Sequence, residues 1–212
     1  MRQIAILWDW DNTLADTFGA ILAAQNAMRR FYGLSVWTKE ESKAAMNTSG
    51  RNLIRDLVGE ERAEEARQIY LKAYTQSASA INLKQGAIDV LEKAKSLGYI
   101  NILASNKAGS ILRNEVHTLN VDHYFDRIIG AEDTPNDKPS KSFTDAALDG
   151  FIYKRIFSIG DGKADIKMGH NYENGYGILV WTNPNTPEFE LDKPDYVFSD
   201  LLPVINFLEK EI

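Results

Sequence analysis

The feature that most constrains the fold is an alternation of short apolar runs with amphipathic segments over residues 83–212. Runs such as INILA at 100–104 and RIFSIG at 155–160 have the length and composition of buried strands. Helix-like segments of about ten to fifteen residues separate these runs, and such spacing is typical of βαβ units around a parallel sheet. We therefore predict the α/β class, with a doubly wound, Rossmann-like parallel sheet.

A helical block interrupts this alternation near the N-terminus. After a first apolar strand, the apolar residues recur at spacings of three and four, which is the pattern of amphipathic helices. Thr38 followed by Glu41 predicts a capping box at the start of one of these helices. We predict an all-helical module at residues 16–82, inserted into an α/β core made of residues 1–15 and 83–212.

The composition excludes several classes of protein. The chain has 212 residues and a formal net charge of -6, so we expect neither a nucleic-acid nor an anionic-membrane surface, which would need clustered Lys and Arg. The absence of cysteine excludes disulfides, thiolate metal sites and a Cys nucleophile, and it fits a cytoplasmic location. No stretch predicts a signal peptide or a membrane span. We expect a small-molecule partner and either a monomer or a homodimer.

Polar side chains follow the predicted strands at their carboxyl ends, which meet at one edge of a parallel sheet where ligands bind. These residues are Asp9, Asp11, Ser105, Asn106, Lys107, Lys138, Asp161 and Asp165. Clustered carboxylates repel one another unless a cation lies among them, and Mg²⁺ prefers carboxylate, water and phosphate oxygens. The hydroxyl, the lysines and nearby backbone N–H groups suit a phosphoryl group. The sequence thus predicts phosphoryl-transfer chemistry with bound Mg²⁺.

The order of these residues resembles that of the haloacid dehalogenase superfamily, in its phosphoglycolate-phosphatase-like branch. DWDNT at 9–13 resembles the first motif, Asp-x-Asp-x-Thr, while Ser105, Lys138 and GDGKAD at 160–165 resemble the second, third and fourth motifs. The resemblance covers essentially the whole chain and implies that the helical module is a C1 cap. Position 12 is Asn where many relatives have Gly, and we expect the turn to survive because Asn tolerates left-handed backbone angles.

The resemblance implies a Mg²⁺-dependent phosphatase that acts on a small phosphate ester through an aspartyl-phosphate intermediate. Asp9 would be the nucleophile, and Asp11 would protonate the leaving alcohol and later deprotonate water. The implied metal ligands are Asp9, the main-chain carbonyl of Asp11, Asp161 and Asp165. The groups implied to hold the phosphoryl group are Ser105, the backbone N–H of Asn106 and Lys138, with Thr13 fixing the geometry of the loop.

Two positions allow more than one interpretation. Arg51 lies at a predicted helix start, where it either contacts an anionic or hydroxylated leaving group or faces solvent beside a Ser49 cap. Trp10 either shields the site or touches the cap. If the chain stays extended beyond the first strand, Asp9 and Asp11 share one face and Trp10 points the other way.

Particular residues and segments of the chain decide between a phosphatase and the alternative activities. Dehalogenases and phosphonate-cleaving relatives lack the second aspartate, so Asp11 disfavours both. A phosphomutase of the β-phosphoglucomutase type uses both aspartates and a similar cap, and it remains the alternative to a phosphatase. A response-regulator receiver domain is smaller and has no helical insert. A catalytically inactive phosphate-binding protein is disfavoured because all the predicted catalytic side chains are present. The phosphate ester itself stays open.

Overall fold

The fold consists of two compact units, seen in a computed structural model of the whole chain. The described residues are 4–46, 50–77, 81–181 and 192–211. The first unit consists of Met1–Ala15 and Leu83–Ile212, and the second unit is Asp16–Asn82.

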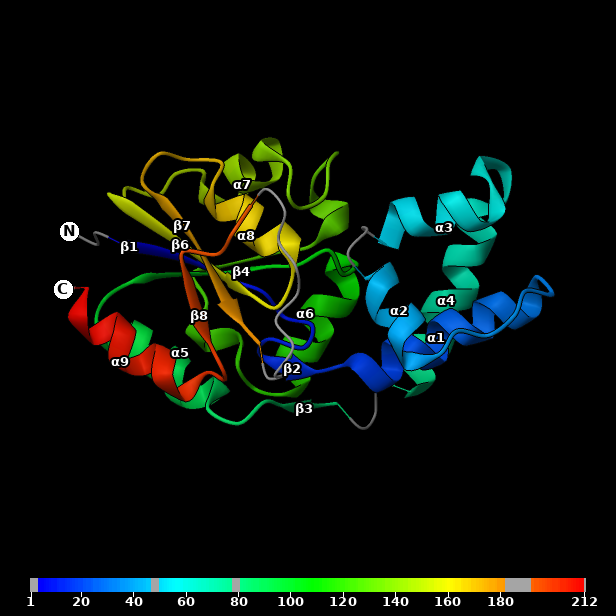
Figure 1. Cartoon of the computed structure of the whole chain (residues 1–212), viewed down its shortest axis with the longest axis horizontal. Helices are drawn as coiled ribbons and strands as arrows, with labels where there is room; N and C mark the ends of the chain where they lie inside the picture. Colours follow the sequence, from blue (N-terminus) through cyan, green and yellow to red (C-terminus); the bar gives the residue numbers. More distant parts are fainter. Residues whose placement is uncertain (1–3, 47–49, 78–80, 182–191, 212) are drawn as a thin grey trace. The chain divides into compact units, whose positions relative to one another are not determined.

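The first unit is built on a six-stranded sheet with the spatial order β5-β4-β1-β6-β7-β8 (Figure 1). The strands are β1 (Ile4–Trp8), β4 (Ile100–Ala104), β5 (Arg127–Ile129), β6 (Arg155–Gly160), β7 (Gly175–Val180) and β8 (Tyr196–Phe198). Every pairing is parallel, and all residues of β1 and β4 are buried, as their mainly apolar composition predicts. The order of the strands reverses between β1 and β6, so the predicted doubly wound α/β fold is confirmed.

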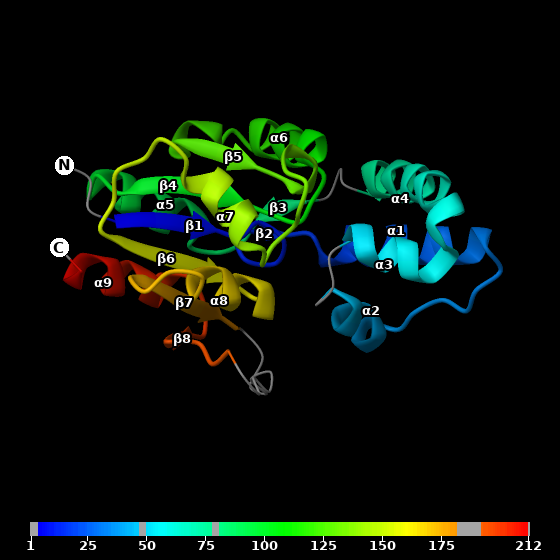
Figure 2. The ribbon, with the colours of Figure 1, turned by 90° about the horizontal axis from the view of Figure 1, so that it is seen from above.

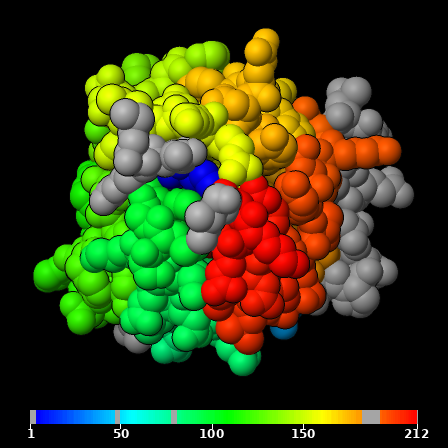
Figure 3. All heavy atoms as spheres, turned by 90° about the vertical axis from the view of Figure 1, so that its left-hand side faces the viewer, coloured from blue at the N-terminus to red at the C-terminus, as the bar shows by residue number. Residues whose placement is uncertain are grey.

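Helices cover both faces of this sheet (Figures 1 and 2). One face carries α7 (Lys141–Leu148) and α8 (Lys163–Gly169), and the other carries α5 (Ala87–Ser96), α6 (Gly109–Thr118) and α9 (Leu202–Lys210). Phe143 of α7 and Met168 of α8 share a buried cluster with Leu7 of β1. On the opposite face α9 lies beside α5 (Figure 3). Lys93 of α5 and Glu209 of α9 form an ion pair of 2.7 Å. The described residues also contain 3-10 turns at η1 (Glu60–Arg62), η3 (Asp122–Tyr124) and η4 (Ala131–Asp133).

The second unit is helical in its described part. Its helices are α1 (Phe18–Phe31), α2 (Lys39–Ala45), α3 (Gly50–Val58) and α4 (Ala63–Ser77). The predicted capping box is confirmed, because Glu41 N–H donates to Thr38 Oγ1 at 3.2 Å and Thr38 N–H donates to Glu41 Oε2 at 2.8 Å. Met28, Ile54 and Ala66 form a core between three of the helices.

Two short strands at the ends of this unit were missed by the sequence pattern. The helix predicted from residue 16 begins at Phe18, because Ala15–Asp16 forms β2, which pairs with β3 (Asn82–Leu83). Strands of two residues have no periodicity that a sequence could display, so this difference is expected. Among the helices that the structure describes, none combines the length and apolar composition needed to cross a membrane.

Candidate active site

The loop after β1 carries Asp9 and Asp11, the first two residues of the predicted site in chain order. The chain does not stay extended there: β1 ends at Trp8, and the carbonyl of Trp10 accepts backbone N–H bonds from the three residues at 13–15. Asn12 has a φ of 62°, the left-handed conformation that the sequence predicts for it. The condition under which Asp9 and Asp11 were expected to share one face is therefore not met, and their side chains contact different lysines.

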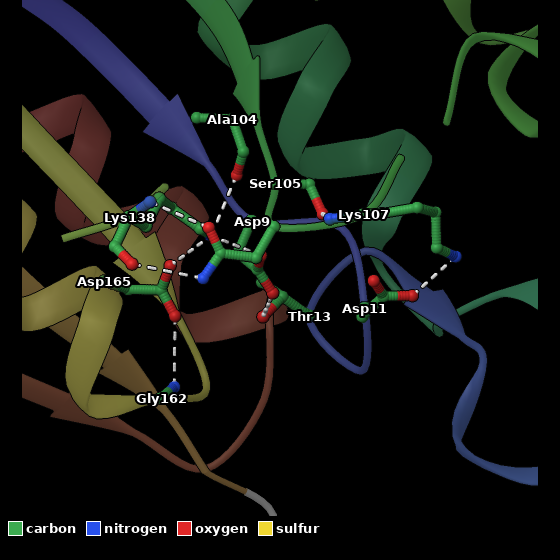
Figure 4. Close-up of polar contacts among 10 residues, drawn as sticks. Asp9, Asp11, Thr13, Ala104, Ser105, Lys107, Lys138, Gly162 and Asp165 are labelled. Atoms are coloured by element: carbon green, nitrogen blue, oxygen red, sulfur yellow. Dashed lines mark hydrogen bonds and ion pairs between the residues drawn. The ribbon is translucent and has the colours of Figure 1, made fainter. Parts of the chain in front are cut away.

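Asp9 is buried beside Lys138, which comes from the loop before α7 (Figure 4). Lys138 Nζ donates to Asp9 Oδ1 at 2.6 Å, to Asp165 Oδ1 at 2.7 Å and to the carbonyl of Ala104 at 2.9 Å. The hydroxyl of Thr13 donates to Asp9 Oδ2 at 3.1 Å. Both oxygens of Asp9 are thus held, and the buried ammonium group is fully engaged between two carboxylates and one carbonyl.

Asp9, Asp161 and Asp165 form an acidic cluster in which one oxygen of each lies within 4.8 Å of the others. Burial raises the pKa of Asp9, and Lys138 opposes the rise. The carboxylates of Asp165 and Asp11 raise the pKa of Asp9 further, so that it lies at about 7. Burial, followed by the charges of Asp9 and Asp165, likewise raises the pKa of Asp161 well above its usual range. Such crowding of oxygen ligands fits a site for a hard divalent cation, whose charge would relieve the repulsion.

Lys138 stays charged in this environment. Burial by itself lowers the pKa of the lysine, but the carboxylates of Asp165 and Asp9 outweigh that effect and raise its pKa above the usual range. The ammonium group therefore supplies a permanent positive charge at the sheet edge.

The position of Asp165 explains a glycine in the fourth motif. A Cβ atom on Gly160 would lie 2.1 Å from Asp165 Cγ, so only glycine leaves room for this carboxylate beside the end of β6. Asp165 Oδ2 also accepts the N–H of Gly162 at 3.1 Å, which holds it in the first turn of α8. The Gly-Asp-x-x-x-Asp spacing therefore places both acidic residues of the motif in the cluster.

The loop after β4 contacts the Lys138 loop through side chains. Asn106 Oδ1 accepts the backbone N–H of Lys138 at 2.8 Å, and Asn106 Nδ2 donates to the carbonyl of Lys138 at 3.2 Å. Ser105 is buried, and its hydroxyl oxygen accepts the N–H of Lys107 at 3.1 Å. The sequence assigned a role only to the backbone N–H of Asn106, whereas its side chain joins the second motif to the third.

Asp11 has a different set of partners. Its Oδ1 lies 2.7 Å from Lys107 Nζ (Figure 4). Lys107 Nζ in turn lies 2.8 Å from Glu115 Oε2. Trp10, whose position the sequence left open, is fully buried and donates its indole N–H to Glu115 Oε2 at 2.7 Å. Lys107 is visible in the sequence because it follows a strand, but Glu115 sits inside an ordinary helical pattern and gives no signal.

Arg51 belongs to the helical unit, in the first turn of α3, and is partly buried. The acidic cluster belongs to the other unit, so a contact of Arg51 with substrate stays a prediction. The predicted Ser49 cap lies outside the described residues.

The fold and the site together define a doubly wound α/β protein with a buried acidic cluster and a lysine at the carboxyl edge of its sheet. Residues 6–174 match the profile of the haloacid dehalogenase-like hydrolases. The chain belongs to this family, and the resemblance drawn from its four motifs is confirmed.

Known relatives cover nearly the whole chain. The phosphoglycolate phosphatase of Aquifex aeolicus (strain VF5) is 26% identical over 208 residues, which are 95% of this chain and 96% of that protein. The pyrophosphatase PpaX of Bacillus cereus (strain B4264) is 23% identical over 216 residues, 99% of this chain and 100% of that protein. These relatives confirm the prediction of an enzyme of the phosphatase class.

Solved structures share the fold. A haloacid dehalogenase-like family hydrolase from Streptococcus pneumoniae superposes with a TM-score of 0.80 at 22% identity, covering 97% of this chain and 98% of that one. A hydrolase from Pseudomonas syringae has a TM-score of 0.82 at 18% identity, covering 98% and 99%.

Proposed function

We propose that this protein is a Mg²⁺-dependent phosphomonoester hydrolase that acts on a small phosphorylated metabolite through an aspartyl phosphate at Asp9. The observation that carries the proposal is the acidic cluster with Lys138 Nζ placed between two of its carboxylates, at 2.6 and 2.7 Å. The nucleophilic carboxylate of Asp9, the charged ammonium group of Lys138 and the proposed metal site then lie next to one another. The family of the chain and the names of its relatives support the same chemistry.

The proposed ligands of Mg²⁺ are Asp9, Asp161, Asp165 and the main-chain carbonyl of Asp11. When bound, the metal would supply positive charge that offsets the repulsion between carboxylate and phosphoryl oxygens. Ser105 Oγ, the N–H of Asn106 and Lys138 would hold those phosphoryl oxygens, and Thr13 would keep Asp9 in position through its hydroxyl bond.

The proposed reaction has two displacements. In the first, a carboxylate oxygen of Asp9 forms a bond to phosphorus while the ester P–O bond breaks, and Asp11 gives its proton to the departing oxygen. In the second, water attacks the phosphorus, Asp11 takes a proton from that water, and the bond to Asp9 breaks. Inorganic phosphate is released, and both aspartates return to their starting protonation states.

A screen of purified protein tests the proposal. We expect hydrolysis of p-nitrophenyl phosphate with Mg²⁺ and a loss of this activity in EDTA. A panel of monoesters, together with phosphoglycolate and pyrophosphate, would then rank the substrates, because these two compounds appear in the names of the relatives. Failure to hydrolyse any ester, with Mg²⁺ or with other divalent metals, would count against the proposed function.

The raised pKa values predict how metal binding depends on pH. The pKa of Asp9 lies at about 7 in the metal-free protein, so below that pH a proton occupies a carboxylate that the metal needs. We expect the affinity for Mg²⁺ to fall at least about tenfold for each pH unit below 7, because the pKa of Asp161, a second proposed ligand, is raised as well. Calorimetric titrations at pH 6.0 and about pH 7.5 would measure this, with proton release detected from the dependence on buffer ionisation. An affinity that is constant over this interval would contradict the prediction.

The helical unit is the proposed cap, which selects the substrate and excludes water during the reaction. If Arg51 contacts an anionic leaving group, Arg51→Ala should raise KM about tenfold or more with a smaller change in kcat. Arg55→Ala is the matched control, since Arg55 lies on the same helix in an exposed ion pair with Glu60. A KM that is unchanged for every good substrate would remove Arg51 from the site.

A further inference from the structure

A chain of polar contacts leads from Asp11 into the protein interior. Lys107 Nζ lies 2.7 Å from Asp11 Oδ1 and 2.8 Å from Glu115 Oε2, and Trp10 donates its indole N–H to the same Glu115 oxygen at 2.7 Å. The side chains of Lys107 and Glu115 are each 6% exposed, and that of Asp11 is 17% exposed. One ammonium group and two carboxylates therefore share a place that is nearly free of water. They hold one another in position, because a buried charge without its partner is strongly destabilising.

The hydrogen bonds of Glu115 indicate why a charged residue occupies this buried position. Its Oε2 accepts the bonds from both Trp10 and Lys107, whereas its Oε1 is buried with no hydrogen-bond partner among the described residues. Leaving a buried carboxylate oxygen unsatisfied costs stability, and an apolar side chain would fill the same space without that cost. The ion pair with the ammonium group of Lys107 explains why residue 115 is a glutamate.

Asp11 pairs with a different lysine from the one that pairs with the acidic cluster. Asp9 and Asp165 of the cluster contact Lys138, whereas the carboxyl of Asp11 is directed to Lys107 (Figure 4). A group that transfers a proton has to be held in one place, because a displacement of about 1 Å can lower the rate about 100-fold. The Lys107 ammonium restricts the Asp11 side chain to rotamers that keep the contact.

We propose that Lys107 and Glu115 are positioning residues that hold the carboxyl of Asp11 for proton transfer to the leaving-group oxygen, and that Trp10 fixes Glu115. The inference rests on the proposed hydrolase function. It assigns to the tryptophan of the first motif and to a residue of α6 a joint task in that reaction.

The test compares two esters whose rings are similar and whose leaving groups differ. p-Nitrophenolate departs without a proton, whereas the alkoxide oxygen of benzyl phosphate needs one. For Lys107→Met, which keeps the length of the side chain and removes its charge, we expect kcat/KM for benzyl phosphate to fall about 100-fold. The loss for p-nitrophenyl phosphate should stay below about fivefold. Glu115→Gln should give the same pattern with a smaller loss, because Gln can still accept the bond from Trp10.

A double substitution separates positioning from general damage. In an Asp11→Asn background, Lys107→Met should cause no further loss with benzyl phosphate, because its effect passes through Asp11. Lys93→Met is the matched control, since it removes an ion pair with Glu209 between α5 and α9. This control should keep the wild-type kcat/KM with both esters.

The outcomes distinguish the inference from the function on which it rests. Equal losses with both esters, or a further loss in the Asp11→Asn background, would overturn the inference while the hydrolase function stands. Absence of turnover with every ester would instead defeat the proposed function. If benzyl phosphate is not hydrolysed, crystal structures of the wild type and of Lys107→Met decide the matter. A displaced Asp11 carboxyl in the variant supports the inference, and an unchanged rotamer overturns it.

Discussion

Asp9→Asn should lower kcat by about 10⁴-fold or more, because the amide cannot form the aspartyl phosphate. The substitution keeps the shape of the side chain, and its Oδ1 can still accept the bond from Lys138. We also expect the metal-free variant to be at least as resistant to thermal unfolding as the wild type at pH 7.5. Folding raises the pKa of Asp9 from 3.8 to about 7. Ionisation of this buried carboxyl therefore destabilises the folded state increasingly as the pH rises from 3.8 to about 7, and fully above that, and Asn removes the charge.

Two measurements check this prediction. Steady-state hydrolysis gives kcat, and mass spectrometry after rapid quenching shows whether the peptide that contains Asp9 carries a phosphoryl group. Asp145→Asn is the matched control, because it removes an exposed carboxylate paired with Lys141 on α7 and should leave kcat unchanged. A phosphoryl group on another residue, or an Asp9→Asn variant with more than about a tenth of the wild-type kcat, would contradict the assigned nucleophile.

Lys138→Met should lower both stability and activity. The lysine neutralises Asp9 and Asp165 at 2.6 and 2.7 Å, and its removal leaves buried carboxylates without a cation. Breaking such a pair costs about 3–5 kcal/mol, which corresponds to a fall in Tm of about 10 °C in a chain of this size. We expect kcat to fall about 1000-fold or more, because the charge also faces the phosphoryl group in the proposed reaction.

The pH dependence of this loss follows from the same pKa values. Below pH 7 the carboxyl of Asp9 takes up a proton, so fewer negative charges need a partner and the difference in Tm between variant and wild type should shrink towards pH 5. Added Mg²⁺ should also restore part of the Tm at pH 7.5, because the metal supplies charge at the same place. Lys141→Met, which breaks an exposed ion pair, should change Tm by less than about 3 °C. Equal Tm values for Lys138→Met and wild type at pH 7.5 would contradict the role of this pair.

Several parts of the site could be predicted because they depend on local sequence. Asp9, Asp161 and Asp165 follow apolar runs, and the carboxyl ends of parallel strands meet at one edge, so their proximity follows from the fold class. The left-handed backbone of Asn12 and the capping box at Thr38 are likewise set by neighbouring residues. For Asn12 and the capping box the signal and the structure lie within a few positions of one another in the chain, and for the acidic cluster each strand end is marked by its own local pattern.

Other parts of the site join residues that are far apart in the sequence. Asn106 binds the main chain of Lys138 across 32 positions, and Trp10 binds Glu115 across 105 positions. Neither contact has a local pattern, since each partner taken alone belongs to an ordinary loop, turn or helix. The turn at Trp10 also ends the extended backbone, so strand alternation, which would place two aspartates two residues apart on one face, does not describe Asp9 and Asp11.

The sequence by itself determined the doubly wound sheet, the acidic residues at its carboxyl edge and the family, because strand and helix periodicity and the four motifs are local properties of the chain. The tertiary structure alone decided which lysine pairs with which of these carboxylates. It places Lys138 between Asp9 and Asp165, and it directs Asp11 towards Lys107. The physical reason is that a buried charge takes its partner from whichever element the fold brings within hydrogen-bond distance, and that choice is made in three dimensions.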